Sequence, residues 1–362
     1  MTQSLVPLLL LFLSSGVTAF IVTGIVKRGS EHIGFVDVPD ERKHHTGATS
    51  RLGGVAIIFG FGFPLLMLAA EDNGAALMSS NVKALFGLLA AGSLIVGLGV
   101  YDDILGANAP KKFAVQIAAA LILVLFGFQF DIISVAGQVF HLGILGVVAS
   151  VIWIVGVINA VNFIDGMDSL ATVVALTTAV AFCVIAILRG DMFSLVVMIA
   201  LAGSLAGFYP WNRPPAKIFM GDTGSMFIGL LLAAASIAQP TKSPTALIIG
   251  GPIVALALPV IDTLIVMKQR FATSNSDGFS SRISRVFSAD RRHIHHILIA
   301  KYGSAGKAVF GIWIVTLLFA TAAVLTVVQQ TKWFGYTAGG VAFLVLLLLR
   351  YWRRGVPVAG NA

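Results

Sequence analysis

The sequence predicts an all-α polytopic integral membrane protein with about eleven transmembrane helices. Hydrophobic residues make up 57% and charged residues only 11% of the 362 residues, which is too apolar for a water-soluble surface. Apolar runs long enough to cross a bilayer alternate with short polar segments along the chain. Lysine and arginine are concentrated in every second polar segment, as in membrane proteins with a fixed orientation.

A helix needs about 20 apolar residues to cross the hydrocarbon layer. No basic segment precedes the first apolar run and no small-residue cleavage site follows it, so we expect a retained helix rather than a signal peptide. Residues 128–142 partly alternate in polarity and are expected to form a small external hairpin. We expect helices at residues 4–26, 52–70, 84–100, 113–128, 144–161, 169–188, 192–209, 223–238, 245–267, 308–328 and 334–350.

The domain organisation is simple. We find no internal repeat and no separate soluble domain, so residues 1–362 are expected to form a single transmembrane domain. Its longest polar segment, residues 268–306, is expected to be a cytoplasmic loop that carries a histidine motif. The single cysteine, Cys183, lies in an apolar run, which excludes a disulfide framework and a cysteine-based metal site.

The basic residues orient the predicted helices. Of the 24 lysines and arginines, only Lys83, Arg189, Lys242 and Lys332 fall on one face. The positive-inside rule makes the other face cytoplasmic, with the N-terminus outside and the C-terminus inside. The formal net charge of +8 is therefore interpreted as a signal of topology, and no nucleic-acid partner is expected.

The first cytoplasmic segment, DVPDERKHHTGATSRLGG, covers residues 37–54. Lys43 and its basic neighbours offer donors suited to a phosphate or an anionic headgroup. The alternative is a basic loop that only contacts lipid phosphates.

An acidic pair ends the third predicted helix. Asp102 and Asp103 are followed by Lys111 and Lys112 before the fourth helix. Adjacent side chains on a helix diverge, so we expect one aspartate near a metal or a proton and the other in a structural or electrostatic role. The alternative is that both acids cap a helix or face solvent.

The segment NAVNFIDGMDSLA places Asn159, Asn162, Asp165 and Asp168 between two apolar runs. One such residue is usually a cap or a turn residue. Four at spacings of three drift slowly around a helix and can face one cavity. We therefore expect these side chains to line a site at the membrane boundary.

The segment KIFMGDTGSMFIG places Asp222 among small residues at the start of the eighth predicted helix. Small neighbours allow a ligand to approach the backbone, and the helix N-terminus offers N–H groups to an anion. The alternative is an ordinary N-cap. In the ninth predicted helix, Asp262 lies among apolar residues, where an acid normally faces a cavity or a partner.

The segment ADRRHIHHIL combines His293, His295 and His296 with Arg291 and a second arginine. The histidines could bind zinc, but no cysteine accompanies them and the arginines raise the local positive charge. Phosphate binding is the better functional interpretation, and a solvated cytoplasmic helix is the alternative.

Together, five segments on one predicted face supply acids, carboxamides, lysine, arginine and histidine. This set is typical of a magnesium-assisted phosphate site with oxygen ligands and cationic contacts. A transporter, the rival hypothesis, would place its essential charges near the bilayer midplane at broken helices.

The motifs DVPDERKHH, YDD, NAVNFIDGMDSLA, FMGDTGS and ADRRHIHH, in this order and at these intervals, resemble the polyprenyl-phosphate N-acetylhexosamine-1-phosphate transferases. This is the superfamily of WecA, MraY and the eukaryotic dolichyl-phosphate GlcNAc-1-phosphate transferase. The histidine spacing and the ADR before it are similar to the bacterial WecA branch. Two departures stand out: Ser169 replaces a usual glycine, and TGATSR (46–51) replaces the more frequent PTPR.

The resemblance implies transfer of GlcNAc-1-phosphate from UDP-GlcNAc to undecaprenyl phosphate, giving undecaprenyl-diphospho-GlcNAc and UMP. It implies Mg²⁺, with Mn²⁺ as a substitute, at the cytoplasmic face of the bacterial inner membrane, and it suggests a homodimer among membrane lipids. UDP-GalNAc and UDP-MurNAc-pentapeptide are alternative donors. The reaction would be the first membrane step of cell-envelope polysaccharide synthesis, and the polymer supplied stays open.

The resemblance also implies roles for individual residues. Asp222 corresponds to the metal-binding acid of the family, and Asn162 to a second metal ligand and substrate contact. The acidic pair, the lysine after it, and the acids of the NAVNFIDGMDSLA motif correspond to catalytic positions: Asp102, Asp103, Lys111, Asp165 and Asp168. The residues expected to bind substrate are Lys43, Asn159, Asn162, Arg291, His293, His295 and His296.

The expected mechanism follows from the acceptor. A lipid phosphate already carries its nucleophilic oxygen, so the protein needs only to align it with the β-phosphorus and stabilise charge. We therefore expect direct attack in one step. A two-step route through an aspartyl nucleophile is the alternative.

Overall fold

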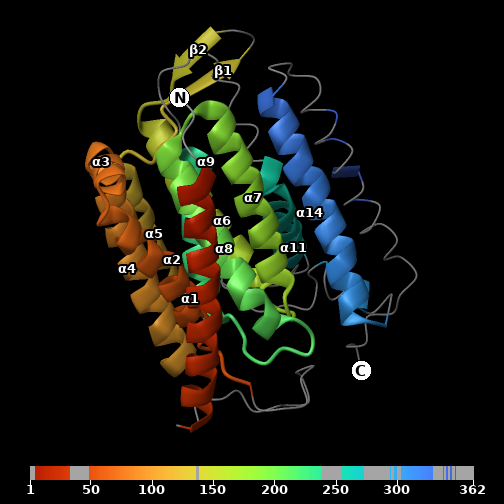
Figure 1. Ribbon diagram of the computed structural model, residues 1–362. Helices are drawn as coiled ribbons and strands as arrows, with labels where there is room; N and C mark the ends of the chain where they lie inside the picture. Colours follow the sequence, from red (N-terminus) through yellow and green to blue (C-terminus); the bar gives the residue numbers. More distant parts are fainter. Residues whose placement is uncertain are drawn as a thin grey trace.

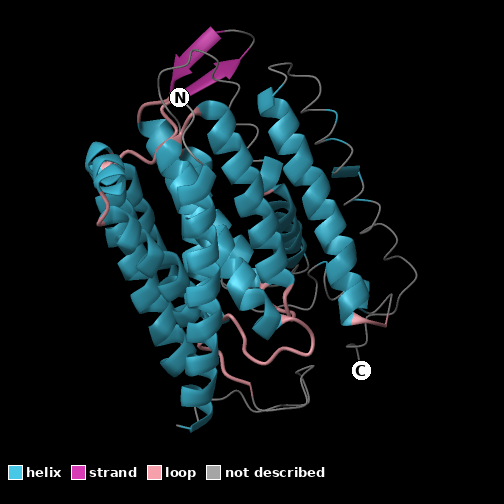
Figure 2. Ribbon diagram, viewed as in Figure 1, coloured by secondary structure: helices cyan, strands magenta, loops and turns pink. Residues whose placement is uncertain are grey.

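The computed structural model describes residues 5–32, 49–135, 138–238, 254–272 and 303–328, with the isolated positions 294, 297–299, 337, 340, 343–344 and 347. Within these residues the chain forms a helical bundle with one two-stranded hairpin (Figures 1 and 2). This confirms the prediction of an all-α membrane protein. The helices are α1 (Leu5–His32), α2 (Gly53–Ala69), α3 (Asp72–Ser80), α4 (Val82–Leu105), α5 (Ala109–Leu125), α6 (Ile144–Ile164), α7 (Leu170–Arg189), α8 (Met192–Asn212), α9 (Gly221–Ile237), α11 (Ala257–Ala272) and α14 (Ala305–Val328).

Ten of the predicted spans coincide with these helices, although α11 begins later and ends later than expected. The eleventh, residues 334–350, falls mostly outside the described residues, as do residues 245–253. By length and composition, six described helices could cross a membrane, or up to seven if α2 and α3 count as one span bent by 105°. The total of eleven spans and their orientation stay predictions.

Helix α3 was not expected. It runs for only nine residues, Asp72–Ser80, directly after α2. Its sequence, DNGAALMSS, is polar compared with the flanking helices, and at this length it is too short to cross a bilayer. The short helix follows α2 at a bend of 105°, and by length and composition the two together could form one broken span.

The predicted hairpin is confirmed. Strands β1 (Ile132–Val135) and β2 (Gln138–His141) pair antiparallel, with Ile132 opposite His141. The hairpin follows the end of α5 and precedes α6, so it lies at the end of the bundle away from the α4–α5 connection. Figure 1 shows it at the top, whereas the light green segment 213–220 lies at the bottom.

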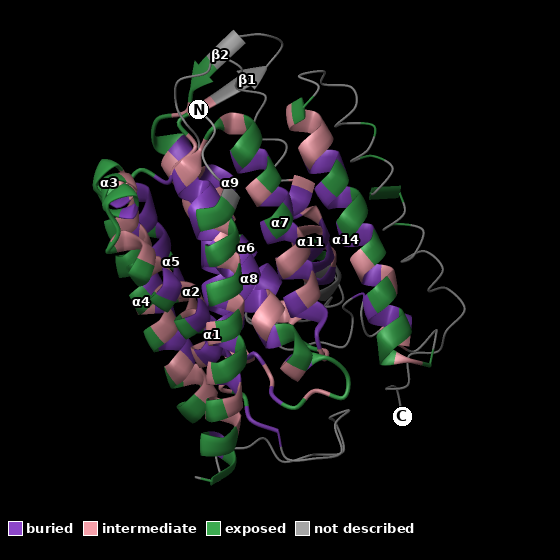
Figure 3. Ribbon diagram, in the orientation of Figure 1, coloured by how far each residue is buried: buried purple, intermediate pink, exposed green. Residues whose placement is uncertain are grey.

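Helices α8 and α9 form the centre of the bundle, and α1 and α4 have large exposed apolar faces (Figure 3). Helix α1 approaches α8 closely because glycines face each other. A Cβ placed on Gly207 would lie 2.0 Å from the carbonyl oxygen of Gly16. Small residues at such interfaces let membrane helices pack backbone to backbone. The exposed apolar faces are those expected to contact lipid.

The last residues of the loop before α2 contact the segment that precedes α9. Ser50 and Ile218 form a parallel bridge, and the Phe219 N–H donates to the Ser50 carbonyl at 2.8 Å. The N–H groups of Gly53 and Gly54 donate to the carbonyls of the segment that precedes α9. These bonds place residues 49–54 beside the start of α9.

Candidate active site

Three charged side chains from three helices meet where α4 ends and α5 and α9 begin. The Lys112 ammonium on α5 lies 2.6 Å from a carboxylate oxygen of Asp222 on α9. It also forms an ion pair with Asp102 on α4. The Asp102 side chain is 7% exposed, and Asp222 is about one third exposed at 33%. Two carboxylates therefore contact one ammonium group at a partly exposed site. The two acids, Asp102 and Asp222, are 120 residues apart in sequence.

Asp103 has different partners from its neighbour. Its carboxylate accepts hydrogen bonds from the backbone N–H of Asp222 (2.8 Å), the N–H of Thr223 (3.0 Å) and the Thr223 hydroxyl (2.6 Å). Asp103 therefore satisfies the first N–H groups of α9 from another helix. The sequence suggested that the start of this helix offers N–H groups to an anionic ligand, and two of them donate to the Asp103 carboxylate.

The turn before Asp222 requires glycine. Gly221 has φ of 71°, and a Cβ there would lie 2.1 Å from the Arg51 carbonyl oxygen and 2.8 Å from a carboxylate oxygen of Asp103. Only glycine adopts this conformation readily with no side chain to collide. The small residues of the GDTGS motif therefore serve close backbone contact, which brings the acid of α4 against the start of α9.

The C-terminal end of α6 completes the cluster. The Asn162 carboxamide donates to the Ser225 hydroxyl at 2.9 Å and also interacts with the Asp222 carboxylate. Asp165 follows the last residue of α6. Burial raises the pKa of Asp165 well above its ordinary value, the nearby Asp222 and Asp103 carboxylates raise this pKa further, and Arg51 opposes them. The expected grouping of Asn162 and Asp165 with Asp222 is therefore present in the structure.

Asp168 and Asn212 hold the turn between α6 and α7. The Asp168 carboxylate accepts from the Ala216 N–H at 2.9 Å. The Asn212 carbonyl oxygen accepts from the Ser169 N–H and the Thr172 hydroxyl, and its amide donates to the Ile218 carbonyl. The segment before α9 is thus tied to the α6–α7 turn. Asn212 was missed because a lone asparagine at a helix end carries no motif.

The backbone conformation of Ser169 explains why glycine is usual at this position of the motif. Its φ is 61° and its ψ is −7°, a left-handed conformation that is unfavourable for residues with a Cβ. Glycine adopts it readily. The departure noted in the sequence therefore leaves the turn in place and adds local strain.

Two predicted site residues point elsewhere. Asn159 is 7% exposed, and its amide donates to the Gln116 carbonyl oxygen (2.7 Å) and the Val155 carbonyl oxygen (2.8 Å) inside the bundle. Lys111 lies over the Tyr101 ring, 6.0 Å from its centroid, and the lysine between the acids is Lys112. The roles assigned to Asn159 and Lys111 stay predictions, and the geometry favours the neighbouring Lys112.

The remaining predicted contacts, Lys43, Arg291, His293, His295 and His296, lie outside the described residues. Asp262 is 3% exposed, and its carboxylate accepts from the backbone N–H of Ile294 at 3.1 Å. We expected this acid to face a cavity or a partner. Its partner is the backbone of Ile294, which belongs to the histidine motif.

The cluster provides few ligands for a metal ion. Within the part of the chain that the structure describes, no group of three or more His, Cys, Asp or Glu side chains could hold one. Mg²⁺ is usually held by one or two carboxylates, with phosphates and waters completing its shell. Asp222 with the carboxamide of Asn162 fits this pattern, and the acids already surround a cation, the Lys112 ammonium.

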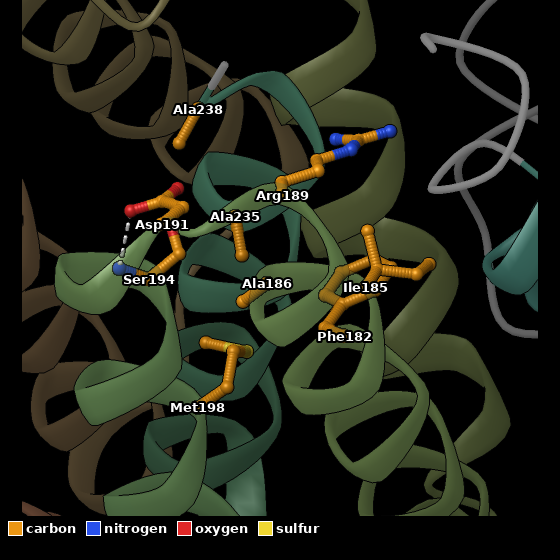
Figure 4. Close-up of a pocket in the computed structure, with 9 residues that line it drawn as sticks. All are labelled: Phe182, Ile185, Ala186, Arg189, Asp191, Ser194, Met198, Ala235 and Ala238. Atoms are coloured by element: carbon orange, nitrogen blue, oxygen red, sulfur yellow. Dashed lines mark hydrogen bonds between the residues drawn. The ribbon is translucent and has the colours of Figure 1, made fainter. Parts of the chain in front are cut away.

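A separate crevice lies at the opposite end of the helices. Side chains of α7, α8 and α9, among them Phe182, Met198 and Ala235, line it (Figure 4). At its rim the Asp191 carboxylate accepts from the Ser194 N–H at 3.0 Å, which is a cap within one helix. None of the predicted site residues lines this crevice, so the charged cluster is the candidate site.

Comparison with known proteins identifies similar sequences along most of this chain. The model of the family described as "Glycosyl transferase family 4" matches residues 85–239, which contain the whole charged cluster. The chain is 30% identical over 360 residues to the probable undecaprenyl-phosphate N-acetylglucosaminyl 1-phosphate transferase of Bacillus subtilis, covering 99% of this chain and 94% of that protein.

Two further relatives differ in the sugar that their names contain. The decaprenyl-phosphate N-acetylglucosaminephosphotransferase of Mycolicibacterium smegmatis is 33% identical over 374 aligned positions, covering 94% of this chain and 87% of the relative. The phospho-N-acetylmuramoyl-pentapeptide-transferase of Streptococcus pneumoniae serotype 19F is 32% identical over 240 positions, covering 64% of this chain and 70% of the relative.

Proposed function

The chain belongs to glycosyl transferase family 4, among the polyprenyl-phosphate N-acetylhexosamine-1-phosphate transferases, and from this premise we propose its reaction. The enzyme transfers GlcNAc-1-phosphate from UDP-GlcNAc to undecaprenyl phosphate and yields undecaprenyl-diphospho-GlcNAc and UMP. The observation that carries the proposal is the meeting of Asp102, Lys112 and Asp222 inside the region that matches the family. The relatives named for GlcNAc align over more of the chain than the one named for the muramoyl pentapeptide, which favours UDP-GlcNAc.

The charges of the cluster suit a reaction between two phosphate-bearing substrates. Lys112 offers a positive charge to the donor diphosphate, and Asp102 lies against it. We assign Asp102 to accept the proton of the acceptor phosphate when that phosphate arrives protonated. Lys112 then stabilises charge on the transferred group, which is the main requirement of phosphoryl transfer.

The neighbouring residues orient this machinery. Asp103 holds the first turn of α9 and so directs the Asp222 side chain. Asp165 lies near Asp222 and Arg51, and we assign it with Asp168 to the nucleotide and diphosphate region. The histidine motif would complete the donor site.

Asp222 and Asn162 would hold Mg²⁺, with Mn²⁺ as a substitute. The ion would neutralise part of the diphosphate charge. Small oxygen ligands from the protein, with phosphate oxygens from the donor, suit such a hard cation.

We place the cluster at the cytoplasmic face of the bacterial inner membrane. Lys111, Lys112, Arg213 and Lys217 lie in or beside the connections at this end of the bundle, which follows the positive-inside rule. A cytoplasmic site also suits a nucleotide-sugar donor. We further propose a homodimer, in line with the family resemblance, and a role in cell-envelope polysaccharide synthesis.

The proposed function is tested by release of UMP. Purified protein in detergent is incubated with UDP-GlcNAc and undecaprenyl phosphate, with Mg²⁺ or with a chelator. We expect Mg²⁺-dependent UMP release only when the acceptor is present, and slower turnover with UDP-GalNAc. Failure to release UMP with an active acceptor lipid would favour a transporter or lipid-handling protein.

The number of chemical steps is tested by stereochemistry. Direct attack by the acceptor phosphate inverts the configuration of a chirally labelled β-phosphorus. Passage through an aspartyl intermediate inverts it twice. We expect inversion, and net retention would exclude the one-step route.

A further inference from the structure

A second polar layer lies one turn deeper than the charged cluster. Gln116 is 1% exposed and Asn159 is 7% exposed, although both lie on apolar helices. The Asn159 amide donates to the Gln116 carbonyl oxygen at 2.7 Å, and the Gln116 amide faces the Asn159 carbonyl oxygen and the Met226 sulfur, each at 3.5 Å. Two uncharged carboxamides therefore pair across α5 and α6 and contact α9.

Each residue of this second layer lies about one helical turn from a residue of the first cluster. Gln116 follows Lys112 by four residues on α5, and Met226 follows Asp222 by four residues on α9. Residues four apart lie on the same face of a helix. On α6, Asn159 and Asn162 are three apart and also share a face. The two layers therefore involve the same faces of the same three helices.

The position of Lys112 depends on the rotation of α5 about its axis. Helix α5 packs mainly on α4 and α6, yet the Lys112 ammonium must reach Asp222 on α9. Between membrane helices no hydrophobic effect drives association, so interhelical hydrogen bonds and close packing set rotation. The Gln116 side chain contacts both Asn159 on α6 and Met226 on α9.

We propose that Gln116 and Asn159 are positioning residues whose paired carboxamides hold α5 in the rotation that places Lys112 between Asp102 and Asp222. This inference rests on the proposed transferase function. It gives Asn159 a role inside the bundle in place of contact with the donor. The pair acts through Lys112 and touches no substrate.

The test compares kcat, the KM for UDP-GlcNAc and the unfolding temperature in detergent. Gln116→Met keeps the length of the side chain and removes the carboxamide. We expect it to lower kcat about tenfold while KM changes less than about twofold, since small displacements of a charge-stabilising group cost rate. In a Lys112→Met background, Gln116→Met should cause no further loss of kcat.

Two variants serve as rescue and control. The exchange Gln116→Asn with Asn159→Gln restores one long and one short carboxamide, so it should recover most of the kcat that Gln116→Asn alone loses. Ser236→Ala removes another hydrogen bond between α6 and α9, in which the Trp153 N–H donates to the buried Ser236 hydroxyl at 2.8 Å. This variant should lower the unfolding temperature without changing kcat, because Ser236 lies about 21 Å along α9 from Asp222.

Three results would overturn the inference. One is an equal loss of kcat from Gln116→Met with and without Lys112. Another is an increase in KM for Asn159→Gln that the exchange does not correct, because Asn159 would then contact the donor. The third is failure of the exchange to recover activity in a folded protein. Absence of UMP release from the wild-type enzyme would instead reject the proposed function. If Gln116→Met does not fold, Gln116→Asn provides the same comparison.

Discussion

Acidic residues lie at both ends of the bundle, but they have different partners. At one end, Asp102 and Asp222 from α4 and α9 meet around Lys112 from α5. At the other end, Asp191 accepts the N–H of Ser194 in its own helix. An acid at a helix boundary is usually a cap. The comparison shows that a candidate site is recognised by acids that converge from distant segments, and the following variants test that distinction.

The largest effect is expected at Asp222. Asp222→Ala should lower kcat at least about 1,000-fold, because a hard cation loses its carboxylate ligand and a charged group is lost from the reacting centre. The protein should remain folded, since the first N–H groups of α9 are held by Asp103. UMP release and the unfolding temperature are measured together. Wild-type rates would remove Asp222 from the site.

A smaller effect is expected at Lys112. Lys112→Met keeps the length of the side chain but removes the charge between the two acids, and kcat should fall about 100-fold. Lys111→Met is the matched control, because Lys111 lies over Tyr101 and should retain activity within about threefold. Both variants are measured with saturating substrates. An equal loss of kcat in the two would show that the position of Lys112 between the acids gives it no distinct role in catalysis.

The cap at the other end should affect stability alone. Asp191→Ala removes the acceptor for the Ser194 N–H and should lower the free energy of unfolding by about 1 kcal/mol. UMP release at a temperature where both proteins are folded should stay at the wild-type rate. A large loss of kcat at unchanged stability would show that Asp191 contributes to catalysis and would contradict its role as a simple cap.

The smallest effect is expected at Ser169. Ser169→Gly relieves the left-handed conformation, worth about 1 kcal/mol, and the greater freedom of glycine in the unfolded chain offsets part of this gain. The unfolding temperature should rise slightly. Ser169→Ala keeps the strain and serves as the control. A decrease with glycine would show that the serine side chain stabilises the turn.

Much of the fold could be predicted because the bilayer imposes a minimum apolar length on each helix. The hairpin at residues 132–141 was also visible in its alternation. Helix α3 was not predicted, since its nine residues give no apolar run. The order of polar segments predicted that distant acids would converge, and the structure brings Asp102 and Asp222 together around Lys112.

The sequence could not assign directions to neighbouring side chains. Whether Lys111 or Lys112 faces the acids depends on the rotation of α5, whose first turn is capped by Asn108. Asn159 and Asn162 belong to one motif, yet the first pairs with Gln116 inside the bundle and the second reaches α9. Such differences arise from packing between helices, which no local pattern records.

The most direct test of the convergence is labelling with a membrane-impermeant maleimide, in a Cys183→Ser background with single cysteines. Ala107→Cys reports the α4–α5 connection, Ser274→Cys reports the segment leading to the histidine motif, and Gln129→Cys reports the hairpin end. We predict labelling of Gln129→Cys in intact cells, and labelling of Ala107→Cys and Ser274→Cys only after permeabilisation. Labelling of Ala107→Cys and Ser274→Cys from opposite faces would contradict a single shared site.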